Sequence, residues 1–230
     1  MSFFYFYDPY IWVLLVCVVI SGYAQHRINS TFNRFSKITT NKGYTGAFVA
    51  QDILRRNSVS DVRVEQGSGT LTDHFDPRRG LVKLSDPVYR KDSIAANAVA
   101  AHEIGHVLQK KEGYGFYKLR TALVPVTNFG SKLAIPLIFI GLLMNNYTLA
   151  QIGVIAYGAI LLFQLVTLPV EFNASRRALA QLDSGGYLDA SEQVGARKVL
   201  NAAALTYVAA TLVSLLQILR LFAMVNRRRR

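Results

Sequence analysis

Four apolar runs constrain the fold of this chain more than any other feature, because each approaches the length of a membrane-spanning helix. Such a helix needs about 20 mostly apolar residues to cross the hydrocarbon core of a bilayer. The runs occupy residues 9–25, 122–144, 147–170 and 202–225. The second run is interrupted by Asn128, Ser131 and Lys132, and its cleanly apolar part is 133–144. We therefore predict a mainly α integral membrane protein with about four transmembrane helices.

The composition supports a membrane protein and argues against a nucleic-acid binder. Apolar residues make up 51% of the 230 residues, and the formal net charge is +12. Long runs almost free of charge do not fit a nucleic-acid-binding surface, whereas anionic lipid headgroups suit both the runs and the positive charge. The terminal RRRR, residues 227–230, is interpreted as a headgroup anchor. The single cysteine, Cys17, lies inside the first run and excludes a disulfide framework.

The apolar runs divide the chain into five segments. The leading MSFFYFYD carries no Lys or Arg, whereas a signal peptide begins with a positive region, so residues 1–25 are predicted to be an uncleaved anchor. A long polar segment, 26–121, precedes a hairpin of two spans over 122–170 that turns at NNY. A short polar segment, 171–201, precedes the last span and basic tail, 202–230. Because two crossings separate the polar segments, both are predicted to lie on the same side of the membrane.

The long polar segment is predicted to form a small α+β unit. Residues 42–57 show the apolar spacing of a helix, and residues 61–66 and 79–87 alternate as strands do. The connection GSGTLTDHFDP is rich in Gly, Asp and Pro and is interpreted as turns. A second helix is predicted over 93–111, because a preceding Asp-Ser pair can cap its start and two lysines suit the dipole of its last turn.

The helix over 93–111 carries HEIGH, which has the spacing of a catalytic zinc site. Residues four apart lie on the same face of a helix, so His102 and His106 can direct both imidazoles at one ion. Zinc binds imidazole and lowers the pKa of a bound water, which makes a hydroxide nucleophile. Glu103 lies beside the metal and can take a proton from that water as general base. The alternative is that two histidines share one helix face by chance.

A catalytic zinc site takes three protein ligands and a water, so a third ligand is needed. The candidates are His26, His74 and any Asp or Glu. Glu171 is one of them, because it follows Pro169, which can open a helix, and lies on the same predicted side of the membrane as HEIGH. On position alone, Glu171 can also be an acidic residue favoured by the positive end of a helix dipole.

Several motifs in a fixed order resemble known membrane metallopeptidases over nearly the whole chain. HEIGH, then a membrane hairpin, then EFNAS is similar to the gluzincin peptidases of the Ste24 and HtpX type. The anchor, LTDHFDP, AHEIGH and PVEFNASRRAL together resemble the YugP-type family of neutral zinc metallopeptidases still more closely. The resemblance implies that His102, His106 and Glu171 bind Zn²⁺ and that Glu103 is the general base. It also implies a zincin-like catalytic unit, built from the two polar segments, in a bacterial cell membrane.

One position departs from the gluzincin pattern. Ser175 stands where an aspartate is expected, and such an aspartate would orient a zinc-binding histidine. We consider Asn173 or Asp183 as residues that could take over this role.

Three further residues are candidates for contacts to substrate. His74 lies between two aspartates in TDHFDP, where it can contact metal or substrate or simply belong to a turn whose aspartates bond the backbone. Arg176 and Arg177 follow Glu171 closely. They can stabilise an oxyanion or hold a substrate carboxylate, or they can be interface cations.

The predicted function is peptide-bond hydrolysis by a membrane-embedded zinc metallopeptidase that acts on a protein or peptide substrate. The alternative is a non-proteolytic membrane scaffold or adaptor that keeps a structural zinc. A membrane-protein partner or a homo-oligomer is compatible with either, and nucleic acid is not an expected partner. An edge strand within GLVKLS can pair with an extended substrate.

The distribution of positive charge favours an active site that faces the cytoplasm. The basic residues that flank the spans on the catalytic side are Arg27, Arg34, Lys118, Arg120, Arg176, Arg177, Arg197 and Lys198. The opposite side has an N-terminus without Lys or Arg and the uncharged NNY turn. The C-terminal RRRR argues the other way, because four crossings place it opposite the catalytic side.

Overall fold

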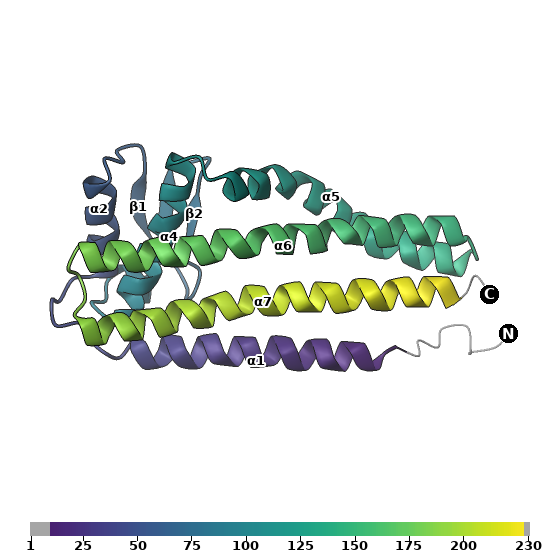
Figure 1. Cartoon of the computed structure of the whole chain (residues 1–230), viewed down its shortest axis with the longest axis horizontal. Coiled ribbons are helices and arrows are strands. Elements are labelled where there is room, and N and C mark those ends of the chain that lie inside the picture. Colours follow the sequence, from purple (N-terminus) through teal and green to yellow (C-terminus); the bar gives the residue numbers. More distant parts are fainter. Residues whose placement is uncertain (1–9, 228–230) are drawn as a thin grey trace. The chain divides into compact units, whose positions relative to one another are not determined.

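The structure, a computed structural model, describes residues 10–227 (Figure 1). The leading MSFFYFYD and three of the four terminal arginines lie outside the described residues. Within them the chain forms seven helices and a sheet of three strands. It divides into two compact units. One unit holds residues up to Ala24, Leu119–Leu168 and residues from Thr206, and the other holds Gln25–Lys118 and Pro169–Leu205.

Three helices are long and apolar enough to cross a membrane, which supports the prediction of a mainly α membrane protein. They are α5 (Gly115–Leu143), α6 (Tyr147–Ser184) and α7 (Ala190–Arg227). Helix α1 (Trp12–Phe35) is not among them, because its apolar run gives way to Gln25, His26 and Arg27 inside the same helix. The described residues therefore support three of the expected four spans, and the crossing by α1 stays a prediction.

Helices α5 and α6 turn back on each other where NNY predicted a hairpin. Asn145 takes a positive φ of 53° in the turn, and the side chain of Asn146 accepts a hydrogen bond from the backbone N–H of Leu149 at 3.0 Å. A Cβ added at Gly141 would lie 2.4 Å from the backbone nitrogen of Ala150. Small residues thus let the two helices approach closely, as is common between membrane helices.

The prediction that Pro169 opens a new helix is wrong. Helix α6 continues from Tyr147 through Pro169 to Ser184 without a break (Figure 1). A proline removes one backbone hydrogen bond from a helix, but helices that cross membranes tolerate this loss. Glu171 consequently lies in the middle of α6, so the positive end of a helix dipole does not explain its presence.

The second unit has the small α+β architecture that the sequence predicted. Its own elements are α2 (Gly46–Arg56), β1 (Arg63–Gly67), β2 (His74–Asp76), β3 (Leu81–Ser85), α3 (Asp86–Tyr89) and α4 (Ile94–Lys111). Ser93 caps α4 as expected, because its side chain accepts a hydrogen bond from the backbone N–H of Ala96 at 3.2 Å. The sheet is mixed, since β3 is parallel to β1 and antiparallel to β2.

Two predictions about the strands need correction. Strand β2 lies in TDHFDP, which the sequence predicted to form turns only, and it pairs Phe75 with Val82 of β3. Asp76 does bond the backbone of the following turn, because its carboxylate accepts from the N–H groups of Arg78 and Arg79. The expected edge strand within GLVKLS is β3, which is the central strand and is paired on both sides. The outer strands of the described sheet are β1 and β2.

Helix α4 is the centre of this unit's core. The fully buried side chains that surround it come from α2, β3, α6 and α7 and include Ile53, Leu84, Leu182 and Leu200. Gly105, the glycine of HEIGH, meets α6 backbone to backbone, since a Cβ added there would lie 2.6 Å from the carbonyl oxygen of Ala174. This approach brings the middle of α6 against the two histidines.

We expect Gly105→Ala to destabilise the protein by about 1–3 kcal/mol, because the added methyl group overpacks the contact with Ala174. Thermal unfolding of the purified protein in detergent, followed by circular dichroism, measures the effect. Gly22→Ala in α1 is the matched control, since nothing lies within 4 Å of a Cβ added at that position. Its midpoint is expected to be unchanged or slightly higher, and equal midpoints for the two variants would contradict the close approach.

Candidate metal centre

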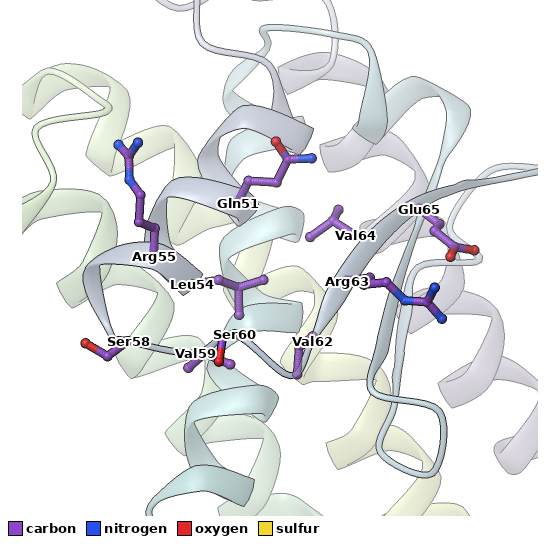
Figure 2. Close-up of a pocket in the computed structure, with 10 residues that line it drawn as sticks. All are labelled: Gln51, Leu54, Arg55, Ser58, Val59, Ser60, Val62, Arg63, Val64 and Glu65. Carbon is purple, nitrogen blue, oxygen red and sulfur yellow. The ribbon is translucent and has the colours of Figure 1, made fainter.

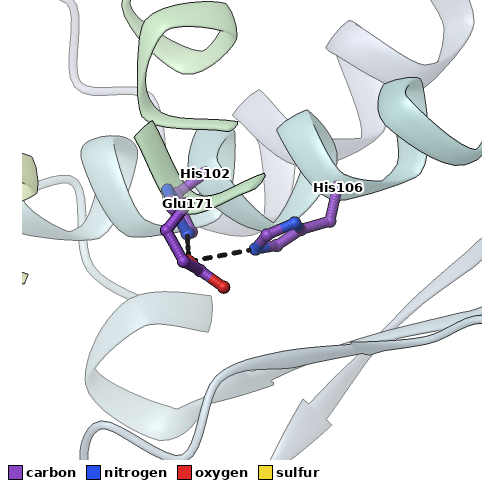
Figure 3. Close-up of side chains that lie close together, drawn as sticks. All are labelled: His102, His106 and Glu171. Carbon is purple, nitrogen blue, oxygen red and sulfur yellow. Dashed lines mark hydrogen bonds and ion pairs between the residues drawn. The ribbon is translucent and has the colours of Figure 1, made fainter. Parts of the chain in front are cut away.

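Two histidines of α4 and one glutamate of α6 converge on a single point (Figure 3). Glu171 Oε2 lies 3.2 Å from His102 Nε2 and 3.5 Å from His106 Nε2. The three groups each offer a ligand atom, and these atoms lie within 4.8 Å of one another. Glu171 is almost fully buried, with 2% of its side chain exposed. Within residues 10–227, this is the group of His, Cys, Asp and Glu side chains with the spacing of a metal site.

The donor set fits zinc. Two imidazole nitrogens and one carboxylate oxygen are a ligand set that catalytic zinc sites use, with a water in the fourth position. Bonds of about 2.0–2.2 Å at tetrahedral angles would place neighbouring ligand atoms about 3.3–3.6 Å apart. The separations of 3.2 and 3.5 Å between Glu171 Oε2 and the two imidazole nitrogens agree with that spacing.

The far nitrogen of each imidazole is held by a polar side chain. Ser175 Oγ lies 3.2 Å from His102 Nδ1, and Gln109 Oε1 lies 3.0 Å from His106 Nδ1. Each ring therefore turns its Nε2 toward Glu171. Partners of this kind orient metal-binding histidines and support their affinity.

These contacts change the sequence-based expectation about which residues orient the histidines. Ser175 contacts His102 itself, although it is not the aspartate of the gluzincin pattern. Asn173 contacts Gln109 rather than a histidine, and the described contacts of the two rings do not include Asp183. Sequence reasoning missed Gln109, although its position three residues after His106 on a helix places the two side chains on one face.

Two buried carboxyl groups at the cluster have opposite electrostatic surroundings. Burial raises the pKa of Glu103 to about 7, and the negative charges of Asp73 and Glu171 add to this effect while His102 opposes it. Burial also acts to raise the pKa of Glu171, but hydrogen bonds and positive charge from His102 and His106 outweigh it and hold that pKa well below its usual range. Glu171 is therefore an ionised carboxylate suited to a cation, whereas Glu103 can exchange a proton.

The structure places His74 beside the cluster rather than in it. His74 lies on β2 with an exposed side chain, and its Nδ1 donates a hydrogen bond to the carbonyl oxygen of Thr72 at 2.8 Å. A positive charge on His74 nevertheless acts to lower the pKa of Glu103. Asp73 is pinned to the end of β3, because its carboxylate accepts hydrogen bonds from the backbone N–H and the hydroxyl of Ser85. Asp73 and His74 are therefore near enough to Glu103 to change its pKa, although neither belongs to the cluster.

The two candidate arginines differ in their surroundings. Arg176 is exposed. Arg177 is half-buried, and it donates from Nε to Asn173 Oδ1 at 2.7 Å and from a terminal nitrogen to Glu112 Oε1 at 2.6 Å. Arg177 is thus held by protein groups, and its described contacts are not those of an oxyanion-binding residue.

A cavity of about 720 Å³ lies elsewhere in this unit, between α2 and β1 (Figure 2). Its lining is formed by Gln51, Leu54, Arg55, Ser58, Val59, Ser60, Val62, Arg63, Val64 and Glu65. It contains no histidine and none of the candidate residues from the sequence. The histidines of HEIGH and Glu171 therefore lie in the cluster of Figure 3 and do not line this cavity.

Comparison with known proteins agrees with the geometry of the cluster. The sequence profile of a family described as "Putative neutral zinc metallopeptidase" matches residues 10–226. The chain is also similar to a protein of Bacillus subtilis (strain 168) named "Putative membrane protease YugP". The identity is 48% over 212 residues, which cover 92% of this chain and 94% of that protein. No solved structure matches the chain. The family resemblance inferred from HEIGH and PVEFNASRRAL is confirmed.

Proposed function

The chain belongs to this family of neutral zinc metallopeptidases, and we propose that it hydrolyses peptide bonds at a membrane-anchored site with Glu103 as general base. The observation that carries the proposal is the buried carboxyl group of Glu103 beside His102, His106 and Glu171. That cluster has the donor set and the spacing of a catalytic zinc site. We propose its three residues as the zinc ligands.

The metal-binding residues and Glu103 have different parts in the proposed reaction. Zn²⁺ bound at the cluster would lower the pKa of a water and polarise the carbonyl group of the scissile bond. His102 and His106 would hold the ion through their Nε2 atoms, and the Glu171 carboxylate would offset part of its charge. Glu103 takes a proton onto its carboxylate from the attacking water and passes it to the nitrogen of the leaving amine.

Glu103 also separates a peptidase from a membrane scaffold with a structural zinc. A structural site needs its ligands and has no use for an additional carboxyl group beside them. Burying an ionisable group without a partner is costly, so such a group marks a functional site more often than a structural one. The burial of Glu103, with 8% of the residue exposed, therefore favours hydrolysis.

The placement in the membrane follows from the same ligand set. His102, His106 and Glu171 must reach one ion, so the segments 26–121 and 171–201 must lie on one side of the bilayer. We propose that α1 is a fourth span that anchors the N-terminus, and that the catalytic side faces the cytoplasm because the basic residues gather there.

We expect Glu171→Gln to lose most of the bound zinc, because an amide has the same shape as the carboxylate but offers no charge to the ion. Metal analysis of the purified protein, with helicity monitored by circular dichroism, measures this loss. His74→Ala is the control and is expected to retain about one zinc per chain. If His74→Ala loses the metal and Glu171→Gln keeps it, the ligand set is three histidines.

We expect Glu103→Gln to retain its zinc while kcat falls by about 10²- to 10⁴-fold, because the variant cannot accept the proton of the water. Cleavage of a broad peptide library by the zinc-loaded protein in detergent or liposomes provides the measurement. Glu65→Gln, on the exposed face of β1, is the matched control and should cleave as the unaltered protein does. Equal cleavage by Glu103→Gln and the unaltered protein would contradict the proposed peptidase mechanism.

We expect cysteines placed at Ser68 and Ser184 to be labelled by a membrane-impermeant reagent from the same face, because both positions are exposed in the catalytic unit. The experiment uses a Cys17→Ser background and compares inverted vesicles with right-side-out spheroplasts. Labelling only in inverted vesicles supports a cytoplasmic site. Met144→Cys, next to the NNY turn, should be labelled from the opposite face. Labelling of Ser68→Cys and Ser184→Cys from different faces would separate Glu171 from HEIGH.

A further inference from the structure

A line of polar contacts leads from the surface of the catalytic unit to one of the two histidines. Glu112 accepts a hydrogen bond from Arg177 at 2.6 Å, and Arg177 Nε donates to Asn173 Oδ1 at 2.7 Å. Gln109 Nε2 donates to the same Asn173 oxygen at 3.0 Å. Gln109 Oε1 then lies 3.0 Å from His106 Nδ1. The mechanism proposed above uses none of Glu112, Arg177, Asn173 and Gln109.

The direction of every hydrogen bond in this line is determined by groups that can only donate or only accept. Arginine only donates, so the Asn173 atom that meets Arg177 is the carbonyl oxygen. That oxygen accepts from Gln109 Nε2, whose second N–H is taken by the carbonyl oxygen of Val170 at 2.7 Å. Both amide hydrogens of Gln109 are thus used, and Oε1 is the atom left to face His106. His106 Nδ1 must therefore carry the proton and donate it.

We propose that Gln109 and Arg177 are positioning residues that hold His106 in its metal-binding tautomer. With a proton held on Nδ1, Nε2 is the nitrogen that can give a lone pair to a metal, which would replace the proton that Nε2 directs at Glu171 in the metal-free cluster. The inference rests on the proposed role of His106 as a zinc ligand.

The different burial of Gln109 and Arg177 explains why both residues are needed to hold His106. Gln109 is fully buried, so the orientation of its amide cannot be stabilised by solvent and depends on its protein partners. Arg177 keeps 23% of its side chain exposed and Glu112 keeps 54%, so the outer end is an ion pair at the surface. Arg177 holds Asn173, and Asn173 with Val170 holds Gln109.

The other histidine is not constrained in the same way. His102 Nδ1 faces the hydroxyl of Ser175, which can either donate or accept a hydrogen bond. The contact therefore orients the ring of His102 without selecting its tautomer. Of the two histidines, only His106 is held in one tautomer by its partner. The role of Arg177 in this arrangement differs from binding an oxyanion or a substrate carboxylate.

The test measures zinc affinity by competition with a chelator, together with the absorption spectrum of the Co²⁺-substituted protein. Gln109→Met, which keeps the length of the side chain but cannot accept the hydrogen bond, is expected to weaken zinc binding by about 10- to 100-fold. Arg177→Gln is expected to weaken zinc binding less than Gln109→Met does. Both variants are expected to shift the Co²⁺ spectrum in the same direction. Arg176→Gln makes the same charge change on the neighbouring exposed arginine and should alter neither quantity.

The variant that combines Gln109→Met with Arg177→Gln shows whether Arg177 acts on His106 through Gln109. If Arg177 acts through Gln109, then Gln109→Met combined with Arg177→Gln binds zinc as weakly as Gln109→Met alone. Unaltered zinc affinity in Arg177→Gln, or losses that add fully in the double variant, would overturn the inference. If Gln109→Met does not fold, the comparison of Arg177→Gln with Arg176→Gln still decides the role of Arg177.

Failure of this inference can be told apart from failure of the proposed function. His106→Ala must lose zinc if the ligand assignment is correct. Zinc binding that survives His106→Ala contradicts the assignment itself. Zinc binding that is lost in His106→Ala but normal in Gln109→Met and Arg177→Gln contradicts only the positioning role.

Discussion

The close backbone contact between α4 and α6 is the constraint on which the rest of the site depends. Gly105 has no side chain to separate the helices, and a Cβ there would lie 2.6 Å from the carbonyl oxygen of Ala174. Within one turn of this contact, short distances bring Glu171 and Ser175 to the histidines of HEIGH. A wider separation of the two helices would part the buried carboxylate of Glu171 from both imidazoles, and burying a charge without a partner is costly in a protein interior.

Two carboxyl groups with different electrostatic surroundings lie near the same contact. Glu171 faces two imidazoles, and their hydrogen bonds and charge hold its pKa below its usual range despite burial. Glu103 is buried close to them, and burial raises its pKa to about 7. Pairs of titratable groups whose surroundings push their pKa values apart are typical of acid–base catalysis. An ionised carboxylate and a carboxyl group that can exchange a proton thus lie at one helix crossing.

The sequence predicted the features that depend on local pattern, and the structure was needed for those that depend on tertiary contacts. HEIGH, the cap at Ser93 and the NNY turn could be identified because helix periodicity and capping are local. Glu171 could be chosen among several candidate ligands only by resemblance, since its meeting with HEIGH depends on how two distant helices pack. Pro169 was misread because the apolar helix around it continues. Strand β2 was missed because its three residues gain strand geometry from β3, within a composition typical of turns.

The proposed metal centre holds one ion by two imidazoles and one carboxylate. X-ray absorption at the zinc edge of the Glu103→Gln protein tests it most directly, because that variant keeps the ligands and does not turn over substrate. The account predicts scattering from two imidazole rings together with oxygen ligands, all at about 2.0–2.2 Å from the zinc. A spectrum that requires three imidazoles, or that shows no ordered imidazole scattering, would contradict the assignment of His102, His106 and Glu171.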